Sequence, residues 1–381
     1  MKPFKNGCCC PKCGRRCKII NVLTDCRTWR DIVVCGLVVF FHYRPKEIIC
    51  PTHGRIQETI PWASEYARIT YRVEYLILMY AQMMSQKDGA RLLALNPSTF
   101  SNLLHAAIER IRSLHNIRGL RSLGVDEIAY KRGKKYATLV YDLDRGCVVW
   151  IGKGKGKETI NDFFTNHLSV HQRKQIKWAS CDMAEGYINA IKEHCPDAKL
   201  VIDRFHIVKA LNTAMDEVRK EEWRSVTGER KKVLKGLRWL LFMHSSNRTK
   251  ADTLLLKQLN KSNRHIYRAW VLKDEFEQFW DYKATWAAER FLKRWITTAL
   301  KSRLEPIRKF ARTIKKHFSL VMAFIERHLT NAAAEGLNRV IKLVKNRASG
   351  FRSLEAFSDL IYLQVGDVDI PARIPLHYRT I

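Results

Sequence analysis

The stretch LGVDEIAYKRGKKYATLVYDLD, residues 123–144, decides the fold. Its two runs of β-branched and aromatic residues are separated by a short basic turn, and a third run, GCVVWIGKG, follows at residues 146–154. Three such runs joined by short turns predict an antiparallel meander. Asp126 lies inside the first run, where a carboxylate is costly unless another group pairs with it or uses it.

After the meander, the chain alternates between strand and helix patterns. We expect helices at residues 158–168, 184–194 and 205–223, and strands at residues 176–182 and 198–203. A meander followed by this alternation predicts a mixed α/β sheet flanked by helices. From residue 212 to residue 330 the pattern is helical only, with 27 Lys and Arg against 13 acids and six of the ten tryptophans. Most of these tryptophans are expected between packed helices, and one or two could stack on an unpaired base.

The composition describes a globular and strongly basic protein. The 381 residues are 46% hydrophobic, and 68 Lys and Arg face 37 Asp and Glu, a formal charge of +31. A globular chain this basic usually binds nucleic acid. The longest apolar run, Ile32 to Phe41, is shorter than the ~18 residues of a membrane span. The N-terminus lacks the apolar segment of a signal peptide, so we expect a cytoplasmic protein without membrane contact.

The first sixty residues predict a zinc module. Eight of the 11 cysteines lie within the first 50 residues, and in a reducing cytoplasm such clustering favours metal binding over disulfides. Cys10 and Cys13 form one pair, and Cys50 and His53 form a second pair with the same two-residue gap. Two such pairs joined by β-rich residues suit a tetrahedral structural Zn²⁺. Cys8, Cys9 and Cys17 remain alternative ligands.

Residues 65–115 have helical spacing and predict a helix-turn-helix. A helix from about residue 86 to 93 precedes a tight turn, after which Asn96 caps a new helix with Pro97 at its first position. The residues that would begin the recognition helix and contact DNA are Ser98, Thr99, Ser101 and Asn102. An ordinary helical hairpin gives the same pattern, and the basic context favours DNA binding.

Three acids stand out as a possible metal site. Asp126 lies in the first strand, Asp182 ends the fourth strand, and Glu335 lies on an amphipathic helix capped by Asn331. Strands one and four are commonly neighbours in this topology, so the three acids can converge. Such a cluster repels itself unless divalent cations fill it, and Mg²⁺ prefers carboxylate ligands. Two such ions about 4 Å apart are suited to phosphoryl transfer.

This order of features resembles the DDE transposases of bacterial insertion sequences, and most closely the ISL-type family. The matching strings are CPKC with CPTHG, LGVDEIAYKRGKKYATLVYDLD, SCDMAEGY, VIDRFHIVK and NAAAEGLNRVIKLVKNRASGF. The resemblance implies an RNase H-like core interrupted by a helical insertion, with Asp126, Asp182 and Glu335 as a triad that binds two Mg²⁺ or Mn²⁺ ions. It makes Asp203 and His206 accessory residues. The chain departs from the resemblance at His53, where many members of the family have a fourth cysteine.

The expected organisation has five parts. They are a zinc-ribbon-like module at 1–60, a helix-turn-helix region at 61–118, the first part of the core at 119–211, the helical insertion at 212–330, and the completion of the core at 331–381. Basic residues close to the core acids are expected to bind the DNA backbone. They are Lys131, Arg132, Lys134, Lys135, Lys153, Lys155, Lys157, Arg339 and Lys342.

The resemblance implies a DNA transposase that recognises terminal inverted repeats, cleaves the element end and joins the freed 3′-hydroxyl to target DNA. Cutting and joining two ends implies at least a dimer on DNA. Two alternatives stay open: a domesticated DNA-binding regulator without catalysis, and an RNase H-like nuclease without strand transfer. Taken singly, Asp182 could cap its helix and Glu335 could be a solvated helix residue. The GKGKGKE segment does not fit a P-loop, so no ATP dependence is expected.

Overall fold

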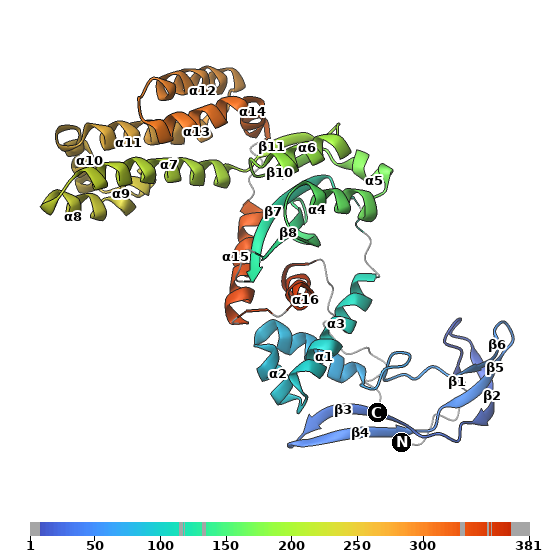
Figure 1. Cartoon of the computed structure of the whole chain (residues 1–381). Coiled ribbons are helices and arrows are strands. Elements are labelled where there is room, and N and C mark those ends of the chain that lie inside the picture. Colours follow the sequence, from blue (N-terminus) through green and yellow to red (C-terminus); the bar gives the residue numbers. More distant parts are fainter. Residues whose placement is uncertain are drawn as a thin grey trace. The chain divides into compact units, whose positions relative to one another are not determined.

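The computed structural model describes residues 8–113, 117, 119–131, 135–327, 332–348, 350–351 and 353–366. For a few helix residues, Glu335 among them, only the backbone is described. The contacts divide the chain into two compact units, residues 1–116 with 339–381, and residues 117–338 (Figure 1). The division into five parts stays a prediction. Arg132, Lys134 and the Asn331 cap lie outside the described residues.

A five-stranded mixed sheet organises the unit of residues 117–338. Its strands are β7 (Ser122–Lys131), β8 (Lys135–Asp142), β9 (Cys147–Lys153), β10 (Trp178–Cys181) and β11 (Lys199–Ile202). The strand order is β11-β10-β7-β8-β9. The β7–β8 and β8–β9 pairs are antiparallel, whereas β10 pairs in parallel with both β7 and β11. The predicted meander and mixed sheet are confirmed.

Short helices pack against this sheet. They are α4 (Lys157–Asp162), its π-helical continuation η1 (Phe163–His167), α5 (Val170–Gln175) and α6 (Glu185–His194). Apolar side chains of β7 such as Val125 form one core with Phe163 and Phe164 of η1 and Ile188 of α6. Helix α5, which the sequence analysis did not predict, begins with a capping box between Ser169 and Gln172.

The remainder of this unit is helical, as predicted. Its elements are α7 (Arg204–Ser225), α8 (Gly228–Gly236), α9 (Arg238–Phe242), η2 (Ser245–Asn247), α10 (Lys250–Ser262), α11 (Arg264–Glu277), η3 (Gln278–Asp281), α12 (Thr285–Leu300), α13 (Glu305–Lys316) and α14 (Phe318–Arg327). Trp270, Trp280 and Trp295 lie in its core, whereas the side chains of Trp239 and Trp286 are 72% and 71% exposed. Most of the six tryptophans were expected between packed helices. Trp239 and Trp286 are instead open to solvent.

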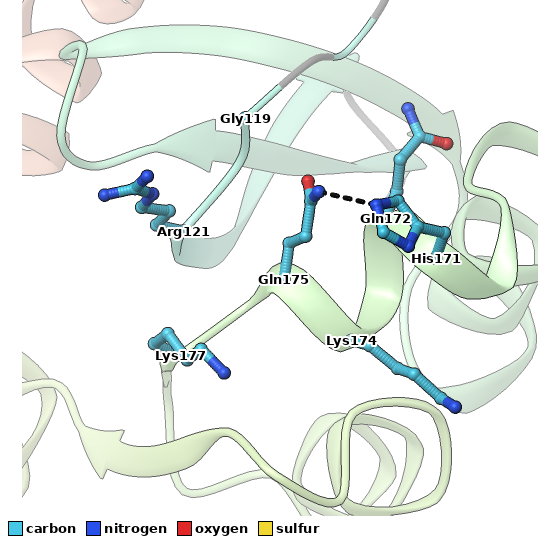
Figure 2. Close-up of a pocket in the computed structure, with 7 residues that line it drawn as sticks. All are labelled: Gly119, Arg121, His171, Gln172, Lys174, Gln175 and Lys177. Carbon is cyan, nitrogen blue, oxygen red and sulfur yellow. Dashed lines mark hydrogen bonds between the residues drawn. The ribbon is translucent and has the colours of Figure 1, made fainter.

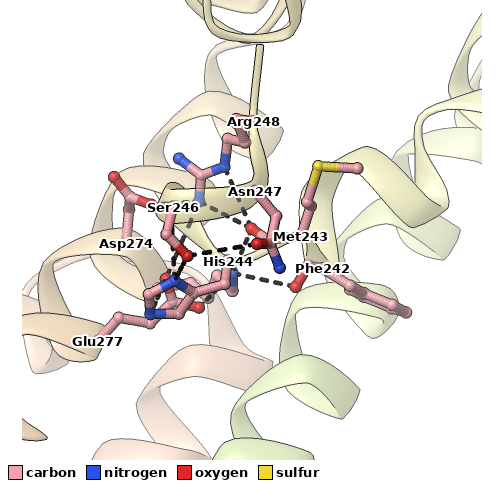
Figure 3. Close-up of polar contacts among 9 residues, drawn as sticks. Phe242, Met243, His244, Ser246, Asn247, Arg248, Asp274 and Glu277 are labelled. Atoms are coloured by element: carbon pink, nitrogen blue, oxygen red, sulfur yellow. Dashed lines mark hydrogen bonds and ion pairs between the residues drawn. The ribbon is translucent and has the colours of Figure 1, made fainter.

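A group of ion pairs and hydrogen bonds holds the segment between α9 and α10 against α11 (Figure 3). The fully buried Lys273 ammonium lies 2.5 Å from Glu277 and donates to the carbonyl oxygens of Phe242 and Met243 at 3.3 and 3.2 Å. Burial lowers the pKa of Lys273, and the Glu277 carboxylate opposes that shift. Arg248 donates to the same Met243 carbonyl at 2.9 Å and to Asp274. These bonds satisfy carbonyl groups that helix α9 leaves open at its end.

The other unit joins small sheets to a helical cluster. Its strands are β1 (Cys8–Cys9), β2 (Arg16–Val22), β3 (Arg27–Val34), β4 (Leu37–Tyr43), β5 (Lys46–Cys50) and β6 (Gly54–Gln57), paired as one sheet of order β1-β2-β5-β6 and one β3–β4 hairpin. Its helices are α1 (Tyr71–Met83), α2 (Gln86–Leu92), α3 (Pro97–Ser113), the later part of α15 (Ala332–Arg347) and α16 (Leu354–Val365). Arg347 and Gln364 donate to carbonyl oxygens at the end of α1, so the C-terminal helices pack against α1.

No helix among the described residues is both long and apolar enough to cross a lipid bilayer.

Candidate active site

Strand register brings three acids to one edge of the five-stranded sheet. Gly124 of β7 pairs with Ser180 of β10, and Cys181 of β10 pairs with Ile202 of β11. Asp126 and Asp182 each lie two residues beyond the first pair, and Asp203 directly follows the second. Neighbouring strands lie about 4.8 Å apart, so these positions fall side by side. The prediction that the first and fourth strands are neighbours is confirmed.

The Asp126 carboxylate is held by three contacts. Its Oδ1 accepts the Glu127 backbone N–H at 2.7 Å, and its Oδ2 accepts the side-chain amide of Asn338 at 2.6 Å. His206 Nε2 lies 3.6 Å from Oδ1. Burial raises the pKa of Asp126, but the hydrogen bonds from His206, Glu127 and Asn338 outweigh burial and leave it below its ordinary value. The carboxylate is therefore ionised at neutral pH.

His206 connects the acids at this edge. Its Nε2 also lies 3.7 Å from Asp203 Oδ2, while Asp203 Oδ1 accepts the Phe205 N–H and caps helix α7. Burial lowers the pKa of His206, but its bond to Asp126 and the charges of Asp126, Asp203 and Asp182 raise it above the ordinary value. The charges of all three aspartates thus favour the protonated imidazole, as expected for a positive group within an acidic cluster.

Asp182 is not the cap of the helix that follows it. Its Oδ1 accepts the Ala184 N–H at 2.9 Å, but the N-cap of α6 is Ala184, which provides no side-chain cap. Glu185, the partner in the capping-box alternative, forms an ion pair with Lys316 at 2.6 Å instead. The alternative prediction, that Asp182 caps helix α6, is therefore wrong.

Glu127 faces the opposite side of the sheet from Asp126, as strand alternation predicts. Its carboxylate accepts a hydrogen bond of 2.9 Å from the buried Tyr187 hydroxyl. The same hydroxyl lies 3.0 Å from the Thr138 hydroxyl and accepts the Gly156 N–H at 3.1 Å. Tyr187 therefore ties the strand that carries Asp126 to the turn between β9 and α4.

Glu335 falls in the first turn of α15, but its side chain is outside the described residues. Asn338, one helical turn later, does contact Asp126. Asn338 was not among the site residues predicted from the sequence. A signal was present, because Asn338 follows Glu335 by three residues in an amphipathic helix and so shares its polar face.

Residues 123–361 match the family model of DDE_Tnp_ISL3, described as a transposase, over well more than half of the chain. The chain belongs to the ISL3 family of DDE transposases. It is therefore a transposase of insertion sequence elements, a phosphoryl-transfer enzyme that binds DNA, and its family implies divalent metal ions. The family expected from the sequence motifs is confirmed.

Two curated relatives agree with this assignment. The transposase is 28% identical over 361 residues to the transposase of insertion sequence element IS1001 from Bordetella parapertussis, covering 94% of this chain and 88% of that protein. It is also 28% identical to the IS1557 transposase of Mycobacterium tuberculosis, covering 93% and 85% respectively. Among solved structures, it matches the Drosophila P element transposase strand transfer complex with a TM-score of 0.37 and 9% identity, over 79% of this chain and 92% of that one. A likeness that loose adds nothing about the fold.

The described basic residues that were predicted to contact DNA are exposed. Lys131 and Lys135 are exposed and pair across the β7–β8 hairpin. The predicted DNA-contacting lysines Lys153, Lys155 and Lys157 are also exposed. Lys155 lies 4.6 Å above the ring of Tyr136, and Lys157 pairs with Glu193 at 2.9 Å. Arg339 and Lys342 are exposed on α15.

A hollow of the same unit lies away from the acids, and Figure 2 shows the residues that line it. It encloses about 840 Å³ and is lined by Gly119, Arg121, His171, Gln172, Lys174, Gln175 and Lys177. These residues precede β7 and β10, whereas the acids lie toward the other ends of those strands. The described residues that line this hollow include no carboxylate that could hold a divalent ion.

The four predicted zinc ligands do come together. His53 Nδ1 lies 3.6 Å from the Sγ atoms of both Cys10 and Cys50, and the Cys13 and Cys50 sulfurs are 3.6 Å apart. A tetrahedral Zn²⁺ with ordinary bond lengths needs separations of roughly 3.5–3.8 Å. Burial raises the pKa of the Cys50 thiol, but hydrogen bonds from Thr52 and His53 bring it down to about 6. This Cys3His cluster could therefore hold zinc.

The alternative cysteines are not among these four residues, although Cys17 packs with Cys10 and Cys50 and Cys8 packs against them. Cys17 donates to the Arg15 carbonyl at 3.2 Å, and burial together with Glu58 raises the pKa of Cys8 to about 12. Among the described residues, one further group has ligand atoms within 4.8 Å of one another: His105, Glu109 and Asp359. The described carboxylates of the sheet edge do not form a group of three whose ligand atoms all lie within 4.8 Å of one another.

The proposed helix-turn-helix residues lie where the sequence placed them. Helices α2 and α3 are joined by residues 93–96, and the Asn96 carbonyl accepts the Phe100 N–H at 3.0 Å. The absence of a side chain at Gly89 lets the Phe100 ring pack closely, because a Cβ there would lie 3.0 Å from it. Ser98, Thr99 and Asn102 are exposed and Ser101 is half-buried at the start of α3.

Proposed function

We propose that the acidic sheet edge is the active site for DNA cleavage and strand transfer, with Asp126, Asp182 and Glu335 as the metal-binding triad. One observation carries the proposal: Asn338 of α15 bonds to Asp126, which lies level with Asp182 on the neighbouring parallel strand. Glu335 precedes Asn338 by one turn, so its position on α15 is suited to the same edge. The strand order also supports an RNase H-like core for residues 119–211.

The donor set at this edge fits Mg²⁺ or Mn²⁺. Carboxylate oxygens on adjacent strands are the ligands that these hard cations prefer, and the accessory His206 offsets part of their mutual repulsion. Two divalent ions bound by the triad would supply Lewis-acid stabilisation of the attacking and leaving oxygens. His206, with Asp203 behind it, keeps the Asp126 carboxylate ionised and ready to bind a cation.

The basic residues position the DNA strand over these acids. Lys131 and Lys135 on one turn and Lys153 and Lys155 on another are exposed and able to contact phosphates. Hydrolysis at the element end would free a 3′-hydroxyl, which then attacks a phosphodiester of target DNA in one transesterification. The bond to the leaving 3′-oxygen of the target breaks as the new bond forms, so no external energy source is needed.

The N-terminal unit is proposed to recognise the terminal inverted repeats. The zinc-ribbon-like module would hold Zn²⁺ through Cys10, Cys13, Cys50 and His53, and α3 would present Ser98, Thr99, Ser101 and Asn102 to DNA as a recognition helix. Joining two ends calls for at least a dimer on DNA. A bacterial cytoplasmic location follows from this role.

The test is an end-cleavage and joining assay. Purified protein would be incubated with a labelled duplex that carries the DNA ends flanking its gene and with a target plasmid, with and without Mg²⁺. Asp126→Asn, Asp182→Asn and Glu335→Gln should each abolish joining, a loss exceeding the roughly 10–100-fold that a lost outer-shell partner costs. Asp197→Asn, an exposed acid of the same unit, serves as the matched control and should join normally.

The alternatives give different outcomes. Metal-dependent cleavage without joined product would favour a nuclease. Tight binding to the ends with no chemistry under Mg²⁺ or Mn²⁺ would favour a regulator that has lost catalysis. Full activity in Glu335→Gln together with loss in Asp203→Asn would move the third ligand from Glu335 to Asp203.

A further inference from the structure

A chain of two hydrogen bonds runs from the sheet interior to the Asp126 carboxylate. The hydroxyl of Tyr141, on β8, donates to Asn338 Oδ1 at 2.7 Å, and Asn338 Nδ2 donates to Asp126 Oδ2 at 2.6 Å. Tyr141 is fully buried, Asn338 is half-buried and the Asp126 side chain is 22% exposed. The chain therefore leads from a fixed phenol to a carboxylate that solvent can reach.

Only one arrangement of these groups satisfies every donor and acceptor. An ionised carboxylate only accepts hydrogen bonds, so the Asn338 amide must direct its NH₂ at Asp126 and its oxygen at Tyr141. The phenol must then be the donor. Burial first, and the nearby charge of Asp126 second, raise the pKa of Tyr141 well above its ordinary value, which keeps that proton in place.

This arrangement fixes the rotation of the Asp126 carboxylate. Its Oδ1 is held by the Glu127 backbone N–H and its Oδ2 by Asn338, which occupies one lone pair on each oxygen. The second lone pair of Oδ2 is left for a cation, whereas Oδ1 also has His206 Nε2 at 3.6 Å. Outer-shell partners of this kind orient metal-binding carboxylates in many sites.

We propose that Asn338 is a positioning residue of the transposase, which orients Asp126 for divalent metal and is itself oriented by Tyr141. This inference rests on the proposed role of Asp126. A purely structural role for Asn338 is a weaker account, because α15 has its own buried apolar residues, Ala334, Ile341 and Val344.

Metal binding without DNA gives the direct test. Mn²⁺ binding to the full chain would be measured by electron paramagnetic resonance for wild type, Asn338→Ala and Tyr141→Phe. Asn338→Ala should weaken Mn²⁺ binding about 10-fold or more, the scale on which lost outer-shell partners act. Tyr141→Phe should shift binding in the same direction by less. Asn346→Ala, an exposed asparagine of the same helix, should bind as wild type does.

Activity should follow the same order. The Mg²⁺ concentration for half-maximal cleavage should rise in Asn338→Ala, and excess Mg²⁺ should restore much of the rate. In the Asn338→Ala background, Tyr141→Phe should have no further effect on Mn²⁺ affinity, because the two residues act through one chain of bonds. Additive effects of the two changes would overturn the inference. Tyr141→Phe keeps the ring and its packing, so the test stands even where Asn338→Ala folds poorly.

Asp126→Asn separates this inference from the function on which it rests. Unchanged Mn²⁺ binding and joining in Asp126→Asn would defeat the proposed triad itself. Loss of both in Asp126→Asn, with wild-type Mn²⁺ affinity in Asn338→Ala, would defeat only the positioning role.

Discussion

The Cys3His cluster and the acidic sheet edge are two proposed metal sites built in opposite ways. In the cluster, each pair of ligands comes from a tight local turn, and the ligand atoms already lie within 4.8 Å of one another. At the sheet edge, the acids come from separate strands and a distant helix, and the described carboxylates do not form such a close group. The difference teaches that the first arrangement is set by local spacing, while the second depends on the register of a whole sheet.

The largest expected effect is on folding, and it tests whether the Cys3His cluster stabilises the N-terminal module. Cys50→Ser should release Zn²⁺ and unfold the module of β1, β2, β5 and β6, because structural zinc contributes apparent binding energies of about 10–16 kcal/mol. Zinc content by atomic absorption and amide exchange of the module would measure the loss. Cys35→Ser, an exposed cysteine outside the cluster, should leave both unchanged. A folded, zinc-free Cys50→Ser module would contradict a structural role for the metal.

The next effect tests how the sheet edge is supported. Tyr187→Phe removes one buried hydroxyl that serves Glu127, Thr138 and the Gly156 N–H. The unpaired groups should lower the free energy of unfolding by about 1–3 kcal/mol, measured by urea titration. Tyr66→Phe, whose side chain is 84% exposed, is the control and should change nothing. A stability equal to wild type would mean that water replaces the Tyr187 hydroxyl without cost.

A smaller effect separates chemistry from folding. Asp182→Asn should abolish joining and yet stay within about 1 kcal/mol of wild type in metal-free stability, because its loss removes a charge that neighbouring acids repel. Urea titration in a chelator together with the joining assay would show both. Unfolding of Asp182→Asn, like the unfolding of the module expected for Cys50→Ser, would contradict the difference between the two sites.

The smallest effect is a pH dependence at the sheet edge. The raised pKa of His206 means that its ion pairs with Asp126 and Asp203 stabilise the fold fully below the ordinary histidine pKa of about 6.5, and lose this contribution as pH rises through the raised value. The lowered pKa of Asp126 sets the opposite limit, because its contribution is lost only in acid, as pH falls through that lowered value.

His206→Gln measures the histidine contribution. The difference in unfolding free energy between wild type and His206→Gln, at most about 1 kcal/mol, should be largest near pH 5 and shrink toward pH 8 in metal-free buffer. His171→Gln, an exposed histidine of the same unit, should show no such trend. A difference that grows with pH would mean that His206 acts as a neutral group.

The sequence anticipated much of this molecule, for reasons that differ between regions. The Cys3His cluster and the strands of the meander were predictable, because a two-residue gap and a period-two pattern are local signals. The neighbouring positions of Asp126 and Asp182 followed from a topological rule, and β10 confirms them. The polar face that Asn338 shares with Glu335 was a local signal, but its bond to Asp126 was not predictable, since a hydrogen bond between residues 212 positions apart leaves no local pattern. Helix α5 was missed because its six residues are too few to show a helical period.

The placement of the helical insertion also affects when the enzyme becomes active during its synthesis. Asp126, Asp182, Asp203 and His206 emerge from the ribosome early, whereas Asn338 and Glu335 follow only after the whole of α7 to α14. A nascent or prematurely ended chain that lacks α15 would therefore have the zinc ligands and helix α3 without the last acid. Under the roles proposed for α3 and the triad, such a fragment would occupy DNA ends without cutting them, and cleavage would require translation to be almost complete.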